Sequence, residues 1–182
     1  MQSLETFCTD RLSAHRLRAE DYGDLCRMHQ DSRVMATLGG LRSDEETRQF
    51  LYKDKAHWER HGFGLWVFRD KLDGQFVGRG GLRNTHVGGN DEVELAYALM
   101  PEFWGKGLAT EMAQASLKVG FEQLGLVDVV CFTMTTNRAS QRVMEKVGFK
   151  YERDIIHADL PHVFYRINAD EWKCDRVAGR RN

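Results

Sequence analysis

The sequence predicts an α+β fold, an α/β sandwich built on one mixed, mostly antiparallel sheet of seven strands with about four helices. Three observations support this class. Short apolar runs bounded by turn residues indicate strands, and capping residues bracket segments with a helical apolar period. A strand, a long helix and a buried-type strand also follow one another over residues 92–133. This last arrangement is a βαβ crossover, and the hairpins that precede it are antiparallel.

Seven segments have the alternation or the apolar run of a strand. They are residues 9–17, 64–69, 75–83, 92–99, 128–133, 151–157 and 162–167. In the fourth, the odd-numbered residues from Val93 to Leu99 face one way and the even-numbered residues from Glu94 to Ala98 face the other. Pro161 is expected in the turn between the last two strands.

Four helices are expected, over residues 20–29, 43–61 and 138–147 and over the segment that ends at Gly125. Ser43 with Glu46 three residues later is a capping box, and Gly62 closes the helix that begins there. Asn137 is a good N-cap for the helix that Gly148 stops.

The 182 residues are expected to form one domain, with a core over about 9–172 and a polar tail over 173–182 that includes Arg180 and Arg181. A net charge of −1 offers no reason to expect binding to nucleic acid or to an anionic membrane. No apolar stretch approaches the roughly 20 residues that span a bilayer, and the N-terminus lacks the apolar core of a signal peptide. A cytoplasmic location is therefore expected.

The four cysteines are scattered and form no CxxC pair, which favours free thiols in a reducing compartment. Cys131 lies in the apolar run VDVVCFTM and is interpreted as a buried core residue. His57 and His61 are spaced i, i+4, but two ligands do not make a metal site, so no metal is expected.

The most informative segment is EVELAYALMPEFWGKGLATEMAQASLKVGFEQLG, in which Gly105 and Gly107 open a helix directly after a strand. The first N–H groups of a helix lack partners and carry the positive end of its dipole. Glycines let a bulky anion approach this backbone, so residues 105–110 are predicted to bind a phosphate.

Three kinds of phosphate loop compete for this segment. A P-loop requires GxxxxGK[ST], but Leu108 follows Gly107 where the lysine would stand. A dinucleotide fingerprint requires a third glycine or alanine, where this chain has Thr110. The third kind, Q/R-x-x-G-x-G/A, cradles the pyrophosphate of coenzyme A, and WGKGLA fits it with Trp104 at the first position.

Together, LMPEFWGKGLATE and TTNRASQRVMEKVGF resemble the GNAT superfamily of acetyl-CoA-dependent N-acetyltransferases. The pattern is most similar to the RimJ/RimL-like branch, which acetylates the N-termini of ribosomal proteins. The likeness also includes TDRLSAHRLRAED, GRGGLRN and VFYRINADEW, and so spans roughly residues 9–172. It implies a GNAT-like sheet whose central strands splay apart, acetyl-CoA as cosubstrate and an amine as acceptor. Dimers are common among similar proteins, so a homodimer is one expected assembly.

The resemblance also assigns cofactor-binding residues. It implies that the pantetheine lies between the strands at 92–99 and 128–133, against the backbone of Leu99 and Met100. The pyrophosphate would be held by the backbone of the glycine turn, at Trp104, Gly105, Lys106, Gly107, Leu108, Ala109 and Thr110. Asn137 would touch the cofactor, and Ser140 would lie near its sulfur, where a hydroxyl can hydrogen-bond the departing thiolate. The alternative is that Asn137 only caps its helix and Ser140 only occupies the first turn.

The reaction requires a neutral amine to attack the thioester. An α-amine with a pKa of about 7.7–8.0 is roughly a tenth neutral at pH 7, whereas a lysine amine with a pKa of about 10.4 is almost wholly charged. An N-terminal substrate therefore needs a strong base less than lysine does. The resemblance implies that Glu94, in the cofactor strand, is the candidate base, acting directly or through a water molecule, and the equal alternative is a solvent-facing strand glutamate. Tyr97, His157 and His162 are weaker candidates on the acceptor side.

Acceptor recognition is expected from the loop at 33–42, the second helix and the hairpin at 157–163. A peptide or protein N-terminus is the first candidate acceptor, and a small amine such as an antibiotic, a polyamine or an amino acid is the second. Two other interpretations stay open: a non-catalytic acyl-CoA-binding sensor, and an acyl-enzyme route through Cys131.

Overall fold

The computed structural model describes residues 4–178. Its sheet has eight strands: β1 (Thr6–Cys8), β2 (Leu12–Arg16), β3 (Leu65–Asp70), β4 (Phe76–Val87), β5 (Asn90–Leu99), β6 (Asp128–Met134), β7 (Lys150–His157) and β8 (Leu160–Asn168). They lie in the order β1-β2-β3-β4-β5-β6-β8-β7. Only β5 and β6 are parallel. The predicted fold class is confirmed, with one strand more than the seven expected.

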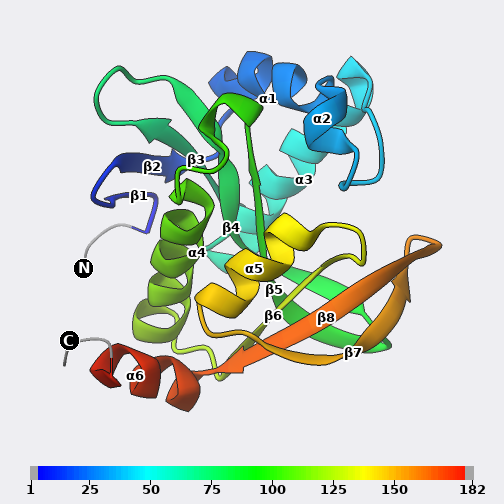
Figure 1. Ribbon diagram of the computed structural model, residues 1–182. Helices are drawn as coiled ribbons and strands as arrows, with labels where there is room; N and C mark the ends of the chain where they lie inside the picture. The colour runs from blue at the N-terminus through cyan, green and yellow to red at the C-terminus, as the bar shows by residue number, and fades with distance from the viewer. Residues whose placement is uncertain (1–3, 179–182) are drawn as a thin grey trace.

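In the described part of the chain, six α-helices accompany the sheet: α1 (Tyr22–His29), α2 (Ser32–Met35), α3 (Asp44–His61), α4 (Leu108–Lys118), α5 (Arg138–Lys146) and α6 (Ala169–Ala178). Short helical turns precede α1 (Ala19–Asp21), follow β5 (Pro101–Phe103) and continue α4 (Val119–Gln123). In Figure 1, α4 and α5 lie in front of the sheet, α3 passes behind it, and α1 and α2 lie at the top. Within residues 4–178 no helix is both long enough and apolar enough to cross a bilayer.

Each predicted helix boundary that rests on a cap is found in the structure. Ser43 and Glu46 make both bonds of the capping box at the start of α3. Gly62 ends this helix in the left-handed conformation, with φ 74°. The Asn137 side chain caps α5 by accepting from the Ser140 N–H. These features form locally because each depends on residues only a few positions apart.

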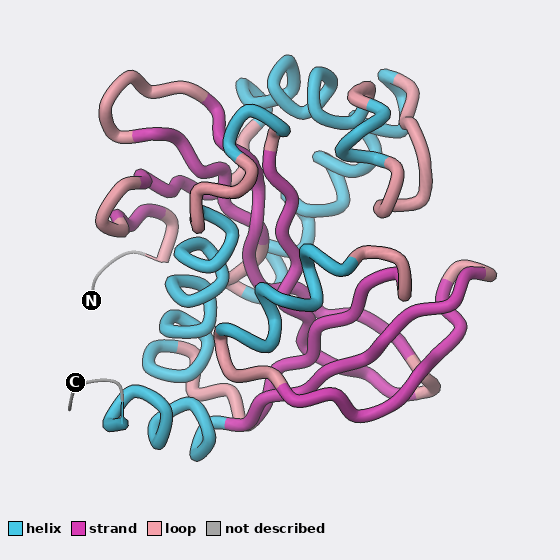
Figure 2. The backbone as a smooth tube through the Cα atoms, in the orientation of Figure 1, coloured by secondary structure: helices cyan, strands magenta, loops and turns pink. Residues whose placement is uncertain are grey.

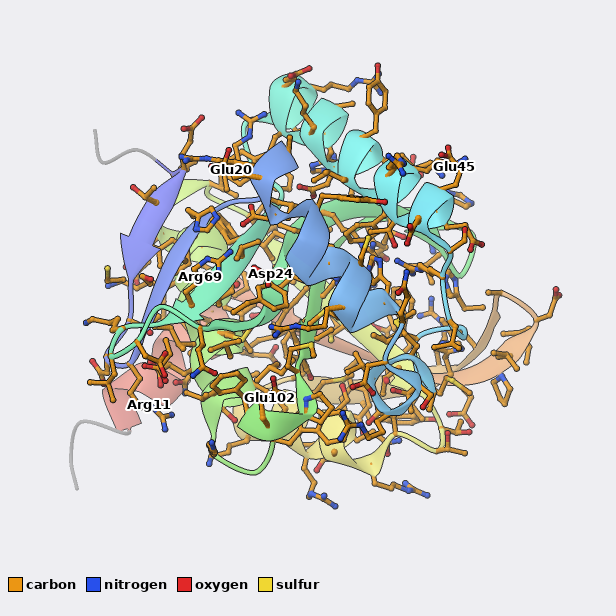
Figure 3. All side chains as sticks on the ribbon, turned by 90° about the horizontal axis from the view of Figure 1, so that it is seen from above. Arg11, Glu20, Asp24, Glu45, Arg69 and Glu102 are labelled. Carbon is orange, nitrogen blue, oxygen red and sulfur yellow. The ribbon has the colours of Figure 1, made fainter. Side chains whose placement is uncertain are left out.

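The view from above shows α1 and α3 lying across the sheet (Figure 3). Asp24 of α1 accepts a hydrogen bond of 2.7 Å from Arg69 of β3, which ties that helix to the strand below. Glu45 lies at the start of α3. The apolar side chains of these helices join those of β2, β3 and β4 in one buried core.

Four expectations about the elements are corrected. The segment 9–17 is a strand only from Leu12 to Arg16. Before it, the Thr9 N–H donates to the Leu12 carbonyl at 2.8 Å and turns the chain between β1 and β2. The glycines at 88 and 89, both at positive φ, close a tight hairpin that carries β4 and β5 further than expected. Pro161 lies in β8 opposite Ile156, and the turn before it is made by Ala158 and Asp159 at positive φ.

The fourth correction concerns the helices beyond the four expected. The short α2 follows Asp31, whose side chain accepts from the Arg33 N–H. The predicted polar tail contains the end of α6, a helix whose Trp172 is buried against the core. Arg180 and Arg181 lie outside the described residues.

Candidate functional site

The candidate site lies where the two halves of the sheet part. β5 and β6 are paired at a single position, Glu94 with Val130, and diverge beyond it (Figure 2). The end of β5 pairs only with β4 along this stretch, where Leu99 lies opposite Gly78. The divergence that the resemblance implied is therefore present between the two strands named for it.

Directly after β5, the chain forms the glycine turn and begins α4. Gly105 and Gly107 have φ angles of 73° and 76°, which side chains disfavour. Gly107 is the N-cap of α4, and no side chain caps the helix there. The first intrahelical bond runs from the Glu111 N–H to the Gly107 carbonyl at 3.2 Å, so the three N–H groups before it are left for another acceptor. This geometry fits an anion, because an uncapped helix start directs these donors and its dipole outward.

Trp104 and Met100 have backbone groups that are already engaged. The Trp104 N–H donates to Pro101, and the Met100 N–H donates to Val77 at 2.9 Å. The Met100 carbonyl accepts from Phe103 at 3.0 Å. The Trp104 indole N–H donates to the Leu99 carbonyl at 2.9 Å, which closes the turn back onto β5. Of the backbone N–H groups predicted to bind the phosphate, those of residues 105–110 therefore remain available.

Arg11, near the N-terminus, holds the glycine turn in place through two hydrogen bonds. Its Nη1 donates to the Lys106 carbonyl at 2.8 Å, and its Nε donates to Glu111 at 2.7 Å. Glu111 also accepts from the Thr9 hydroxyl and from the Arg11 N–H. No local pattern in the sequence predicts this contact, because Arg11 and Glu111 lie 100 residues apart.

The start of α5 lies beside the divergence and carries Asn137 and Ser140. The Asn137 Oδ1 accepts from the Ser140 N–H at 3.2 Å, and its Nδ2 donates to Thr133 at 3.0 Å and to Thr37 at 3.2 Å. Both ends of the amide are therefore used. The bond to Thr37 brings the loop at 33–42, which was predicted to meet the acceptor, next to α5.

Tyr97 of β5 reaches the same place. Its hydroxyl lies 2.9 Å from the Ser140 Oγ and also donates to the Ser140 carbonyl at 3.2 Å. Burial raises the pKa of Tyr97 well above its usual range, so the phenol keeps its proton. The tyrosine beside Ser140 thus comes from strand β5, and α5 itself carries none.

Glu94 lies on the opposite face of β5 from Tyr97, three residues earlier. It is 4% exposed, which contradicts the solvent-facing alternative. Its carboxylate accepts from Arg83 of β4 at 2.9 Å and 3.4 Å. Glu94 and Ser140 are thus not in contact, and β5 stands between them.

The side chains beyond Glu94 are aromatic. Phe132 of β6 lies 4.8 Å from His157 and 6.0 Å from His162, measured between ring centroids. Burial lowers the pKa of His157, and the charge of His162 acts in the same direction. Cys131 is buried, and burial followed by the charge of Glu94 raises the pKa of its thiol well above the usual range. The thiol stays protonated and packs in the core, as interpreted from the sequence.

Comparison with known proteins agrees with this geometry. Residues 11–150 match the acetyltransferase (GNAT) domain. The N-acetyltransferase YoaA of Bacillus subtilis is 37% identical over 146 residues, covering 79% of this chain and 82% of YoaA. The protein YkkB of the same organism is 28% identical over 166 residues, covering 91% of this chain and 96% of YkkB.

Among solved structures, an acetyltransferase of Agrobacterium tumefaciens superposes with a TM-score of 0.81 at 25% identity. The superposition covers 92% of this chain and 96% of that one. The family match covers the divergent strands, the glycine turn and the start of α5, which are the parts that form the site. The chain belongs to the GNAT family of acetyltransferases.

Proposed function

We propose that this acetyltransferase uses acetyl-CoA, the acetyl donor of its family, to acetylate the α-amine at the N-terminus of a peptide or protein. The observation that carries the proposal is the position of the uncapped glycine turn directly after β5, the strand that diverges from β6. An anion at this turn leaves the rest of an elongated ligand free to extend between β5 and β6.

Different residues of the chain would bind the cofactor and assist the leaving group at this site. The N–H groups of residues 105–110 would hold the pyrophosphate, and the backbone of Leu99 would face the pantetheine. Asn137 would order the start of α5. The Ser140 hydroxyl, supported by Tyr97, would donate a hydrogen bond to the leaving sulfur, which becomes more negative during transfer.

Glu94 would receive the acceptor amine from the other face of β5 and assist loss of its proton. Its carboxylate already accepts two hydrogen bonds from Arg83, which hold it in one orientation. The amine would then attack the thioester carbon directly in a ternary complex, with no acyl-enzyme. An α-amine suits this arrangement because it is partly neutral near pH 7 without a strong base.

Relatives differ in acceptor. A putative ribosomal N-acetyltransferase of Bacillus subtilis, YdaF, is 30% identical over 110 residues, covering 57% of this chain and 60% of YdaF. A spermidine N-acetyltransferase of Vibrio cholerae, solved with CoA and spermine, superposes with a TM-score of 0.73 at 16% identity, covering 90% and 98% of the two chains. A small amine is therefore the second candidate acceptor. The RimJ/RimL-like branch, a cytoplasmic location and a homodimer are part of the proposal.

The test has two stages. Calorimetry with CoA examines the donor site, and thiol release from acetyl-CoA is then measured against N-terminal peptides, polyamines and aminoglycosides. Turnover of peptides at a higher kcat/KM than the other amines supports the proposal. Turnover of a polyamine or an aminoglycoside alone would move the assignment to a small-amine enzyme. Binding of CoA without turnover of any amine would indicate the acyl-CoA sensor.

A further inference from the structure

Three arginines converge on the face of the sheet that carries Glu94. Arg79 and Arg83 lie four residues apart on one face of β4, opposite Ala98 and Glu94 of β5. Arg42 comes from the loop before α3. Burial and then the charges of Arg83 and Arg42 lower the pKa of Arg79 to about 9, which shows that the three guanidinium groups act on one another.

Arg79 is the least satisfied of the three. It is 4% exposed, and its Nε has no hydrogen-bond partner among the described residues. Its guanidinium lies 4.9 Å from the centre of the Phe50 ring, and that of Arg42 lies 5.2 Å from the same ring. Buried charges in proteins are normally paired and hydrogen-bonded, because removing them from water is costly. Because the guanidinium of Arg42 lies at the same ring, its positive charge increases the free-energy cost of burying Arg79.

None of the nearby carboxylates is hydrogen-bonded to Arg42 or Arg79 within the described residues. Glu94 is bonded to Arg83. Asp54 of α3 accepts from the Leu65 N–H at 3.1 Å through Oδ1, and its Oδ2 has no partner among the described residues. Glu46, whose charge acts on Arg42, is held in the capping box of α3.

Arg42 itself donates to the Nε2 of His29 at 3.3 Å. Burial and then the charge of Arg79 lower the pKa of this histidine to about 3. The ring of His29 is therefore neutral and does not offset the positive charge of Arg42. Within residues 4–178, neither Arg42 nor Arg79 is hydrogen-bonded to a carboxylate. Two of the three guanidinium groups on this face of β5 therefore have no hydrogen-bonded carboxylate among the described residues.

We propose that Arg42 and Arg79 bind a carboxylate carried by the acceptor, so that the amine to be acetylated belongs to an acidic molecule. This inference rests on the proposed function, because it places the amine at Glu94. A guanidinium presents a planar fork that matches a carboxylate, and a partly buried site strengthens the attraction. The same two guanidinium groups, which no carboxylate hydrogen-bonds within residues 4–178, repel a polycation and disfavour spermidine as acceptor. Two sources supply the chemistry: the α-carboxylate of an amino acid, and an acidic side chain near a peptide N-terminus.

The experiment compares matched acceptors. Thiol release from acetyl-CoA is measured with peptides that carry Asp, Asn or Lys at the second position, with amino acids and their amides, and with spermidine. We expect kcat/KM to be about 10- to 100-fold higher for an acidic acceptor than for its amide, the range typical of charge-assisted hydrogen bonds. The ratio of acidic to amide kcat/KM is compared between the peptides and the amino acids. The group with the larger ratio identifies the source of the carboxylate.

Variants assign the effect to the arginines. Arg42→Gln should lower the ratio of acidic to amide kcat/KM about tenfold, as expected for the loss of one charged hydrogen bond. Arg48→Gln is the matched control, since Arg48 lies on α3, is exposed and contacts Tyr22 on the outer side. The control should leave the ratio unchanged. Arg79→Lys keeps the charge but loses the fork, and it provides a second variant if the Arg42 protein is unstable.

Binding separates this inference from the proposed function. Calorimetry of the acidic and amide peptides with the CoA-bound protein reports on the arginine site without turnover. If the acidic peptide binds more tightly than its amide, and Arg42→Gln removes this difference, the inference is supported. It is supported even if no amine is acetylated, although the proposed function then fails. Equal turnover and equal binding of the acidic and amide acceptors overturn the inference and leave the proposed function intact.

Discussion

The hydroxyl oxygens of Tyr97 and Ser140 lie 2.9 Å apart, although one residue comes from β5 and the other from the first turn of α5. The pair joins the two elements that flank the divergence of the sheet. Two hydroxyls at this distance share one hydrogen bond and leave one proton for another acceptor. The sulfur of a bound thioester is the acceptor that the proposed function provides.

Replacing Ser140 with alanine should lower kcat by about 10- to 1,000-fold, because the leaving thiolate loses its donor. Tyr97→Phe should reduce kcat by a similar factor, and the double variant should lose little more, since the two hydroxyls act as a unit. Steady-state kinetics measure these effects. Ser116→Ala is the control, because the buried Ser116 hydroxyl bonds only to the Met112 carbonyl within α4. Full activity in folded Ser140→Ala would contradict the role.

Gly107→Glu should abolish measurable CoA binding, because it places a side chain and a negative charge at the helix start where the pyrophosphate is proposed to lie. Gly107→Ala and Gly125→Ala form a matched pair, since both glycines have φ near 70°, at 76° and 67°. Each should cost about 1–2 kcal/mol of unfolding free energy. Only the first should weaken CoA binding by calorimetry, and equal affinity in both would argue against a phosphate site at the turn.

Cys131→Ser should leave acetyl transfer within about twofold of normal and lower the free energy of unfolding by about 1–3 kcal/mol, since it buries a hydroxyl in an apolar position. Denaturant unfolding and steady-state kinetics measure the two effects. Cys8→Ser, at an exposed thiol, is the control and should change neither. Loss of transfer in a folded Cys131→Ser protein would support an acyl-enzyme instead.

Asp54 should make the protein less stable as the pH rises from about 4 to 6. Burial raises the pKa of this carboxyl to about 6, against the opposing effects of the Leu65 N–H and Arg79. The folded state therefore keeps a proton that the unfolded state has released, and the free energy of unfolding falls by roughly 3 kcal/mol across this window. Asp54→Asn should remove this fall in denaturant titrations at several pH values. A pH-independent difference from the unmodified protein would refute the assignment.

His29 should act in the opposite direction over the same window. Its folded pKa of about 3 lies below the ordinary value, so the unfolded state takes up a proton first as the pH falls. Between pH 6.5 and 4 the free energy of unfolding should decrease by roughly 3 kcal/mol on this account. His29→Asn should remove that loss, whereas His86→Asn, at an exposed ring, should not. Identical pH profiles for the two variants would exclude the effect.

Much of the site could be predicted from the sequence because its signals are local. The glycine turn, the Asn137 cap and the capping box at Ser43 each involve residues a few positions apart, and each is found where it was expected. The parallel crossover followed from the order of elements. By contrast, β1 was missed and Pro161 was wrongly assigned to the last hairpin turn, because tight turns that use no glycine or proline leave little trace in the sequence.

The sequence by itself determined the fold class, the family and the position of the glycine turn that opens α4, since helix caps and positive φ angles depend on residues close together in the chain. Only the tertiary structure decided which distant side chains meet. Arg11 contacts Glu111, Tyr97 contacts Ser140, and Arg79 lies buried with no hydrogen-bonded carboxylate among residues 4–178. Strand register and packing between layers set these contacts, and both depend on the balance of the whole core.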